Sequence, residues 1–106
     1  MGLFGFSAGA NINEGVKEFA DTEGAVLLDV RTPEEYAAGH IEYSLNIPLD
    51  DIAGAAARIP DKQTPVYTYC LSGARSGRAA AYLKRLGYSK VKNIGGIFSY
   101  RGKVVR

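Results

Sequence analysis

Short apolar runs alternate along the chain with amphipathic segments whose apolar residues recur at helical spacing. The runs at residues 25–30 and 65–69 are rich in aliphatic, β-branched or aromatic side chains, which is typical of strands buried in a parallel sheet. A further short strand is predicted at 91–94, and an extended piece at 44–47. Strands that alternate with helices indicate an α/β fold in which helices cover both faces of the sheet.

The predicted helices carry recognisable start and stop signals. Thr32 can cap a helix that begins at Pro33, and Glu35 completes a capping box. Gly39 is expected to end that helix. Three further helices are predicted: residues 14–21 after the cap Asn13, residues 51–58 after the cap Asp50, and residues 76–86 with Ser76 as the cap.

Length and composition describe one ordinary globular domain. The chain has 106 residues, of which 46% are hydrophobic and 23% are charged. No apolar run approaches the ~20 residues that a membrane span requires, so we expect no membrane partner. The N-terminus lacks the basic and long apolar regions of a signal peptide. We therefore expect a cytoplasmic protein with a flexible arm over residues 1–10 and a folded domain over residues 11–106.

Charge is distributed unevenly around a net value of +2. Residues 1–60 carry a net charge of −7, whereas residues 61–106, which include Cys70, carry +9. A positive field around a cysteine favours its thiolate and attracts small anions, although the same lysines and arginines could simply form a solvated basic face. No motif interleaves aromatic and basic residues, so we do not expect nucleic acid as a partner.

The chain contains one cysteine, Cys70, and one histidine, His40. A single cysteine excludes an intrachain disulfide, and this pair makes a metal site built from protein ligands improbable, so we expect neither a metal nor another cofactor. A lone cysteine is commonly buried filler in a core, and only its neighbours in the sequence can indicate chemistry.

Cys70 directly follows a predicted strand and precedes a predicted helix. In α/β proteins ligands bind beyond the carboxyl ends of strands, and a loop there can turn its N–H groups toward an anion. Gly73 gives this loop the backbone freedom for a tight turn. The pattern predicts a thiolate with a lowered pKa, which could attack the outer sulfur of a donor and carry that sulfur as a persulfide.

Several short motifs match the rhodanese family in order and spacing, and together they extend from about Ile12 to Val105. They are Leu28-Asp29-Val30-Arg31, Glu35-Tyr36, Gly39-His40-Ile41, Asn46-Ile47-Pro48, Cys70-Leu71-Ser72-Gly73-Ala74-Arg75-Ser76 and Gly95-Gly96-Ile97. The resemblance to this family implies a rhodanese-like α/β domain around a five-stranded parallel sheet. It also implies that Cys70 is the catalytic, sulfur-bearing residue. The substrate-binding loop would then consist of Leu71, Ser72, Gly73, Ala74, Arg75 and Ser76.

The function that the resemblance implies is sulfur transfer from thiosulfate or a similar small donor to a thiol or cyanide acceptor. A second hypothesis is a persulfide relay, in which a protein donor or acceptor docks on the basic half of the chain. A non-catalytic regulatory module is disfavoured by the intact cysteine. A phosphatase is disfavoured because four residues separate Cys70 from Arg75, whereas the related phosphatases have five and so form a wider ring.

Asp29, Arg31 and Glu35 are expected to support the loop. Arg75 is predicted to anchor it through Asp29 or Glu35, although Arg75 could instead bind the donor anion. Arg31 is expected to pair with Glu34 or Glu35.

Four other positions complete the expectations. His40, after a helix-ending glycine, is predicted to be structural rather than a general base, and Tyr69 and Tyr100 are candidates for the mouth of the site. Leu71 stands where many family members carry a basic residue that would help to bind thiosulfate.

Overall fold

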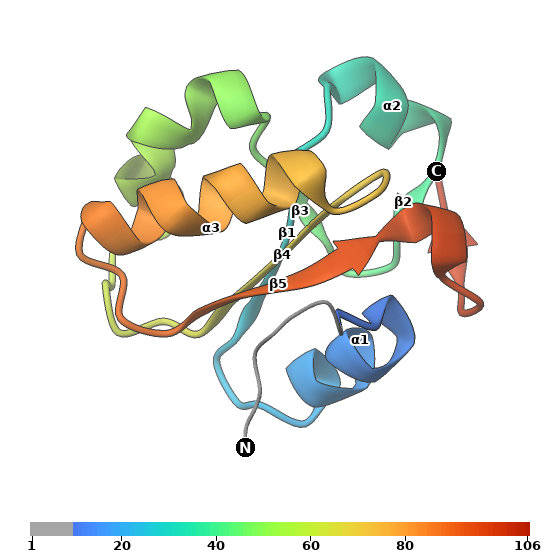
Figure 1. The fold of residues 1–106 in the computed structure, drawn as a ribbon, viewed down its shortest axis with the longest axis horizontal. Helices are drawn as coiled ribbons and strands as arrows, with labels where there is room; N and C mark the ends of the chain where they lie inside the picture. The colour runs from blue at the N-terminus through green and yellow to red at the C-terminus, as the bar shows by residue number, and fades with distance from the viewer. Residues whose placement is uncertain (1–9) are drawn as a thin grey trace.

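Four parallel strands form the main sheet of the computed structural model, which describes residues 10–106 (Figure 1). Their spatial order is β3-β1-β4-β5, and every neighbouring pair is parallel. Their bounds are Val26–Asp29 for β1, Leu45–Asn46 for β3, Val66–Cys70 for β4 and Val91–Gly96 for β5. The predicted α/β class and the predicted strands are confirmed.

The expected fifth strand of this sheet is absent from the described residues. Instead, β2 (His40–Ile41) pairs antiparallel with β6 (Val104–Val105) in a separate two-stranded sheet. Neither segment was predicted as a strand, because a run of two residues carries no periodic pattern. The count of five parallel strands is therefore wrong by one.

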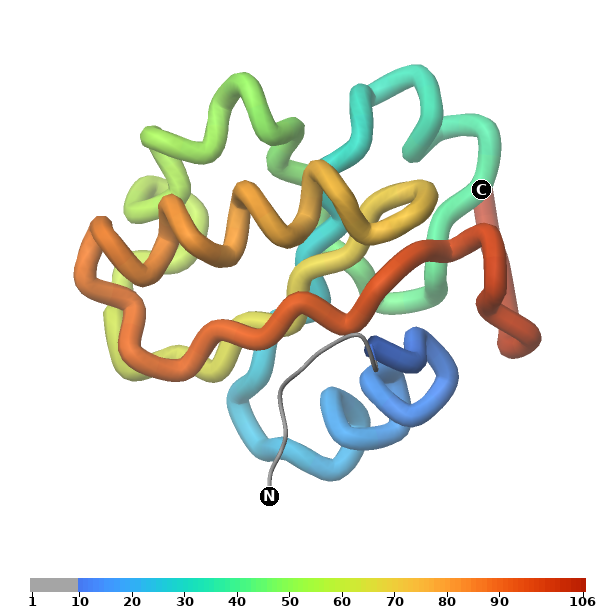
Figure 2. The backbone as a smooth tube through the Cα atoms, in the orientation of Figure 1, coloured from blue at the N-terminus to red at the C-terminus, as the bar shows by residue number. Residues whose placement is uncertain are grey.

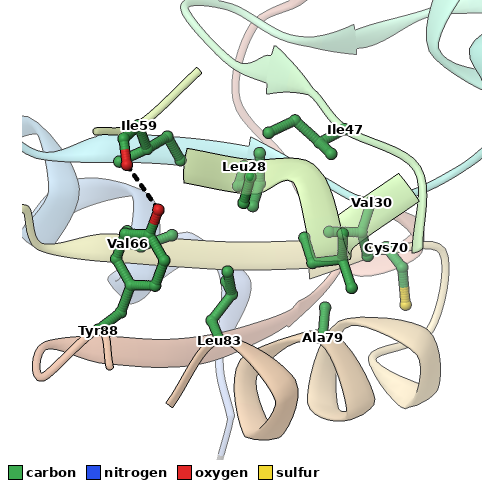
Figure 3. Packing of buried hydrophobic residues seen from close by; sticks show 11 residues of the cluster. Leu28, Val30, Ile47, Ile59, Val66, Cys70, Ala79, Leu83 and Tyr88 are labelled. Atoms are coloured by element: carbon green, nitrogen blue, oxygen red, sulfur yellow. Dashed lines mark hydrogen bonds between the residues drawn. The ribbon is translucent and has the colours of Figure 1, made fainter. Parts of the chain in front are cut away.

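Helices cover both faces of the main sheet, as predicted (Figure 1). On one face α3 (Ala74–Arg85) and the 3₁₀ helix η2 (Leu49–Ala57) pack over a cluster that includes Leu28, Val66 and Leu83 (Figure 3). On the other face α1 (Ile12–Ala20) packs over a second cluster that includes Leu27, Tyr67 and Ile94. Strands that are buried on both faces explain the continuous apolar runs in the sequence.

The helix α2 (Pro33–Ala38) begins and ends where the sequence predicts. Glu35 N donates to Thr32 Oγ1 at 3.2 Å and Thr32 N donates to Glu35 Oε1 at 2.9 Å, which completes the capping box. Gly39 follows as the C-cap. This helix lies at the carboxyl end of the sheet, where it faces the loop after β4 (Figure 1).

Other helix boundaries differ from the predictions. α1 is capped by Asn11 and not Asn13, because Asn11 Oδ1 accepts from the amide of Asn13 at 3.0 Å. The segment η2 follows Pro48 without a side-chain cap, so Asp50 is not a cap, and Gly54 leaves the helical region at φ −93° and ψ 15°. Helix propensity favours an α-helix in such an alanine-rich segment, because it is summed over residue types and does not include the kink at Gly54.

α3 begins two residues before the prediction, at Ala74, and its N-cap is Gly73. Ser76 is therefore the third residue of the helix and not its cap. The chain continues after β5 into the 3₁₀ turn η3 (Ile97–Ser99).

No helix formed by residues 10–106 is long and apolar enough to cross a bilayer. The arm expected over residues 1–10 lies, apart from Ala10, outside the described residues.

Replacing Leu83 with alanine tests the packing of α3 on the sheet. Leu83 is 0% exposed in the core, so the L83A substitution should lower the free energy of unfolding by about 2–5 kcal/mol. The matched control is L71A, which removes the same atoms from a side chain that is 45% exposed and should cost no more than about 1 kcal/mol. Urea unfolding measures both, and equal losses would contradict this assignment of the core.

Candidate active site

Only three residues, 71–73, connect the end of β4 at Cys70 to the start of α3. Gly73 has φ 108°, a left-handed conformation that side chains other than glycine rarely adopt. A Cβ atom at Gly96 would overlap the carbonyl group of Leu71, so β5 can approach the loop this closely only with a glycine there. Phe98 N donates to Leu71 O at 3.1 Å. The loop is therefore fixed against the end of β5 (Figure 2).

Three donors converge on the sulfur of Cys70. Its Sγ accepts from Gly73 N at 3.0 Å, from Ser76 N at 3.4 Å and from Ser76 Oγ at 3.4 Å. We call these three donors around Cys70 Sγ the sulfur cradle. Burial raises the pKa of the Cys70 thiol, but hydrogen bonds from the Ser76 hydroxyl and from the amides of Ser76, Gly73 and Ser72 outweigh it. The pKa of Cys70 is therefore below its usual value.

Cys70 itself is 1% exposed and belongs to the core cluster under α3. In Figure 3 its side chain lies at the opposite end of this cluster from Tyr88, beyond Ala79. A buried cysteine is usually inert, and an inert thiol does not require several hydrogen-bond donors around its sulfur. The donors aimed at Sγ distinguish this position from filler, because they stabilise a negative charge that an inert thiol does not develop.

Arg75 is tied to α2, as the sequence predicts for a loop anchor. Its guanidinium donates to Glu35 Oε1 at 2.8 Å and to Glu35 Oε2 at 3.0 Å, which is a bidentate pair. The hydrogen bond from Arg75, opposed by partial burial and reinforced by the Thr32 donors, lowers the pKa of Glu35 to about 2. The same carboxylate thus caps α2 and holds the first turn of α3.

The expected partners of Asp29 and Arg31 are wrong. Arg31 Nη2 donates to Asp29 Oδ2 at 2.8 Å and to the carbonyl of Gly39 at 2.7 Å, so neither Glu34 nor Glu35 is its partner. Asp29 is 0% exposed and is paired to Arg31 rather than to Arg75. The sequence could not choose among these carboxylates, because the choice depends on how β1 and α2 are oriented relative to each other.

His40, Tyr69 and Tyr100 all make packing or hydrogen-bond contacts within the fold. His40 Nδ1 lies 2.8 Å from the carbonyl of Tyr36, and the two rings stack with centroids 3.6 Å apart. Tyr69 is fully buried, and its hydroxyl accepts from Ile41 N at 3.0 Å, so it does not line a mouth. Tyr100 packs against the second core cluster.

Asn93 is a polar residue near the cradle that sequence reasoning missed. Its Oδ1 accepts from Ser76 Oγ at 2.7 Å and from Gly95 N at 3.1 Å, and its Nδ2 donates to Gly73 O at 3.1 Å. The signal in the sequence was an asparagine, a residue rare in strands, inside the strand predicted at 91–94. In residues 10–106 no group of three or more His, Cys, Asp or Glu side chains is placed to hold a metal ion.

A family model described as a rhodanese-like domain matches residues 13–103. The chain belongs to the rhodanese-like family. It is 45% identical over 85 residues to a sulfurtransferase from Allochromatium vinosum, covering 79% of this chain and 78% of the relative. It is also 41% identical over 71 residues to thiosulfate sulfurtransferase PspE from Escherichia coli, covering 66% and 68%.

A solved structure supports the same fold. The chain superposes on a rhodanese with anions from E. coli with a TM-score of 0.72 and 36% identity, covering 77% of this chain and 98% of that one. The domain also matches part of longer proteins, because the chain covers 26% of a relative named tRNA uridine(34) hydroxylase from Enterobacter sp. (strain 638). Family membership therefore fixes the fold, whereas the reaction has to be argued from the site.

The folded state should lower the pKa of Cys70. The rate of alkylation by iodoacetamide, followed against pH, should rise with a midpoint below about 8.5, the ordinary value for a cysteine thiol. The matched control is the same chain unfolded in guanidinium chloride, which has lost the cradle and should show the ordinary midpoint. Identical midpoints in the two states would contradict the cradle.

The Glu35–Arg75 pair should make stability depend on acid pH. Because folding lowers the pKa of Glu35 to about 2, its contribution is complete above the unfolded pKa of about 4.3 and disappears as pH falls toward 2. Wild type should therefore exceed E35Q in the free energy of unfolding above about pH 5, and the two should converge near pH 2. E34Q, on the exposed neighbour, is the control. A difference between wild type and E35Q that does not change with pH would argue against the pair.

Proposed function

We propose that this chain is a sulfurtransferase that carries the transferred sulfur as a persulfide on Cys70. The observation that carries the proposal is the sulfur cradle, which directs three donors at Cys70 Sγ where β4 passes into α3. Sulfur transfer is also supported by relatives named sulfurtransferase and thiosulfate sulfurtransferase. A thiolate held in this way needs no general base, which is consistent with a structural His40.

In the first half-reaction the Cys70 thiolate attacks the outer sulfur of thiosulfate. A bond forms between Cys70 Sγ and that sulfur, the bond between the two thiosulfate sulfurs breaks, and sulfite leaves with the electron pair. The negative charge of the resulting persulfide lies on its outer sulfur. The N–H groups that surround Cys70 Sγ favour negative charge in this loop, so they also favour an anionic persulfide.

In the second half-reaction a thiol, as its thiolate, or cyanide attacks the outer sulfur. The sulfur–sulfur bond of the persulfide breaks, and the electron pair returns to Cys70 Sγ as a thiolate. The cradle then stabilises the leaving group as well as the attacking group. The first half-reaction starts from a thiolate at Cys70 Sγ and the second ends with one, so the same donors to Sγ act in both.

The loop residues have different roles in this proposal. Gly73 and Ser76 supply the donors, and the amide of Ser72 adds to them, whereas the side chains of Leu71 and Ala74 are exposed. Arg75 holds the loop through Glu35 instead of binding the donor.

A persulfide relay is the second candidate function. Leu71 is 45% exposed and Phe98 is 85% exposed, and both line one cavity of about 650 Å³ on the outer side of the loop. Apolar side chains at such a position suit contact with a protein better than contact with a small anion. The donor is therefore the part of the proposal that experiment must decide, and the cytoplasmic location stays a prediction.

Incubation with thiosulfate followed by intact-protein mass spectrometry tests the proposal. The wild-type chain should gain one sulfur atom, and cyanide should then remove it with release of thiocyanate. The matched control is C70S, which keeps the fold and an oxygen at the same place but should gain no sulfur because the hydroxyl is not ionised.

One outcome separates the two candidate functions, and another would overturn both. A gain from a protein persulfide donor, but not from thiosulfate, would select the relay and would keep Cys70 as the carrier. A gain of sulfur by C70S, or no gain from either donor, would overturn the persulfide on Cys70.

A further inference from the structure

The Ser76 hydroxyl is close to three acceptors but has a single proton. Its Oγ lies 2.7 Å from Asn93 Oδ1, 3.4 Å from Cys70 Sγ and 3.4 Å from the carbonyl oxygen of Gly95. A hydroxyl donates one hydrogen bond, so these contacts cannot all be made with the same proton. An uncharged cysteine sulfur is a weak acceptor, whereas Asn93 Oδ1 is an amide oxygen at a full hydrogen-bond distance. The proton is therefore expected to point to Asn93 while the sulfur is uncharged.

The orientation of the Asn93 amide is fixed by its other two partners. Gly95 N is a donor and must face Oδ1, at 3.1 Å, whereas Gly73 O is an acceptor and must face Nδ2, also at 3.1 Å. The atom next to Ser76 Oγ is therefore an acceptor. Cys70 Sγ and Asn93 Oδ1 consequently compete for the same proton.

We propose that Asn93 is a positioning residue that holds the Ser76 proton while Cys70 Sγ is uncharged and releases it when Sγ becomes an anion. This inference rests on the proposed function, because the reaction cycle is what changes the charge of the sulfur at constant pH. Asn93 acts through Ser76 and does not touch the sulfur in the described contacts.

In the uncharged state the hydrogen bonds can form a chain. The thiol of Cys70 can donate to Ser76 Oγ, whose proton is then directed to Asn93 Oδ1. When Sγ is an anion it has no proton to donate, and it is a stronger acceptor than a neutral amide oxygen. The hydroxyl then turns to Sγ, and each group in the chain keeps at least one partner.

When the Ser76 hydroxyl turns from Asn93 to Cys70 Sγ, the other polar groups keep hydrogen-bond partners. Asn93 Oδ1 keeps the hydrogen bond from Gly95 N after the hydroxyl turns away. Gly73 O is held twice, by Asn93 Nδ2 and by Gly77 N at 3.0 Å, so the loop does not depend on Asn93 alone. Because unsatisfied buried groups are what makes such rearrangements costly, this switch should be easy.

The charge on Sγ changes once in each proposed half-reaction. When the thiolate becomes the inner sulfur of a persulfide, its electron pair forms the new sulfur–sulfur bond, Sγ becomes uncharged and the Ser76 proton returns to Asn93. When an acceptor takes the outer sulfur, the electron pair comes back to Cys70 Sγ and the proton turns to the sulfur again. The hydroxyl thus supplies a hydrogen bond to the leaving thiolate only when that charge appears, which is selective stabilisation.

The charged groups around the cradle do not take part in the switch. Arg75, which interacts electrostatically with Cys70, is paired with Glu35 from α2, and Asp29 at the end of β1 is paired with Arg31. Both ion pairs persist while the Ser76 hydroxyl turns. A change in the midpoint of Cys70 alkylation can therefore be traced to Ser76 and Asn93.

A double-mutant cycle on the pH midpoint of iodoacetamide alkylation tests the inference. S76A removes a donor to the anion and should raise the midpoint, whereas N93A removes the competing acceptor and should lower it. Each change should alter the alkylation rate below the midpoint by roughly two- to tenfold, the effect of one net hydrogen bond. In the S76A background N93A should have no further effect, because no proton is left to compete for.

Asn46 provides the matched control. Its Nδ2 donates to Asp29 O and Arg31 O, both at 3.0 Å, so N46A also removes the hydrogen bonds of a half-buried asparagine on the sheet, but away from Ser76. N46A should leave the midpoint unchanged. N93D keeps the shape and both accepted hydrogen bonds of Asn93, and serves if N93A does not fold. It should raise the midpoint, and by less in the S76A background.

The outcomes are distinguishable from failure of the proposed function. A midpoint that N93A raises or leaves unchanged, or a shift of equal size with and without S76A, would overturn the switch and leave the cradle intact. An N93D shift of the midpoint that is equal in the wild-type and S76A backgrounds would also overturn the switch. An ordinary midpoint in the wild-type chain would instead overturn the cradle itself, before any variant is compared.

Discussion

The hydrogen bonds from Gly73 and Ser76 to Cys70 Sγ are the interaction on which the rest of this site depends. A buried thiol normally resists ionisation, because a charge in an apolar environment is costly. Here the sulfur lies at the edge of the core and also at the start of a helix, so backbone N–H groups that need partners are available to it. Burial excludes water from the sulfur, and the donors compensate for its absence.

Elements that are distant in the sequence hold this turn in place. α2 contacts it through the Glu35–Arg75 pair, and the end of β5 contacts it through Gly96, whose missing side chain admits the Leu71 carbonyl. Asn93, also in β5, bonds to Gly73 and Ser76 at once. The cradle is therefore a property of the packed domain, because no single segment contains all the contacts that shape it.

The buried ion pair of Asp29 and Arg31 shows what such packing decides. From the sequence, Arg31 is expected to pair with Glu34 or Glu35 on the capped helix. In the folded chain Glu35 is already engaged by Thr32 and Arg75, and the buried carboxylate of Asp29 at the end of β1 is hydrogen-bonded to Arg31. A buried charge without a partner is costly, so the burial of Asp29 favours its pairing with Arg31. The sequence does not show which carboxylate will be buried.

The sequence by itself determined the α/β class, the strands at the centre of the sheet, the capping box of α2 and the position of Cys70 after a strand. These features depend on local chemistry: continuous apolar runs, a capping side chain three residues from its partner, and a glycine where the backbone must turn. Only the tertiary structure decided the partner of Arg31, the short β2–β6 pairing and the approach of Asn93 to Ser76. The last two of these contacts join residues far apart in sequence. The pairing of Arg31 with Asp29 is local, but its choice over the other carboxylates depends on packing geometry that periodicity and propensity do not contain.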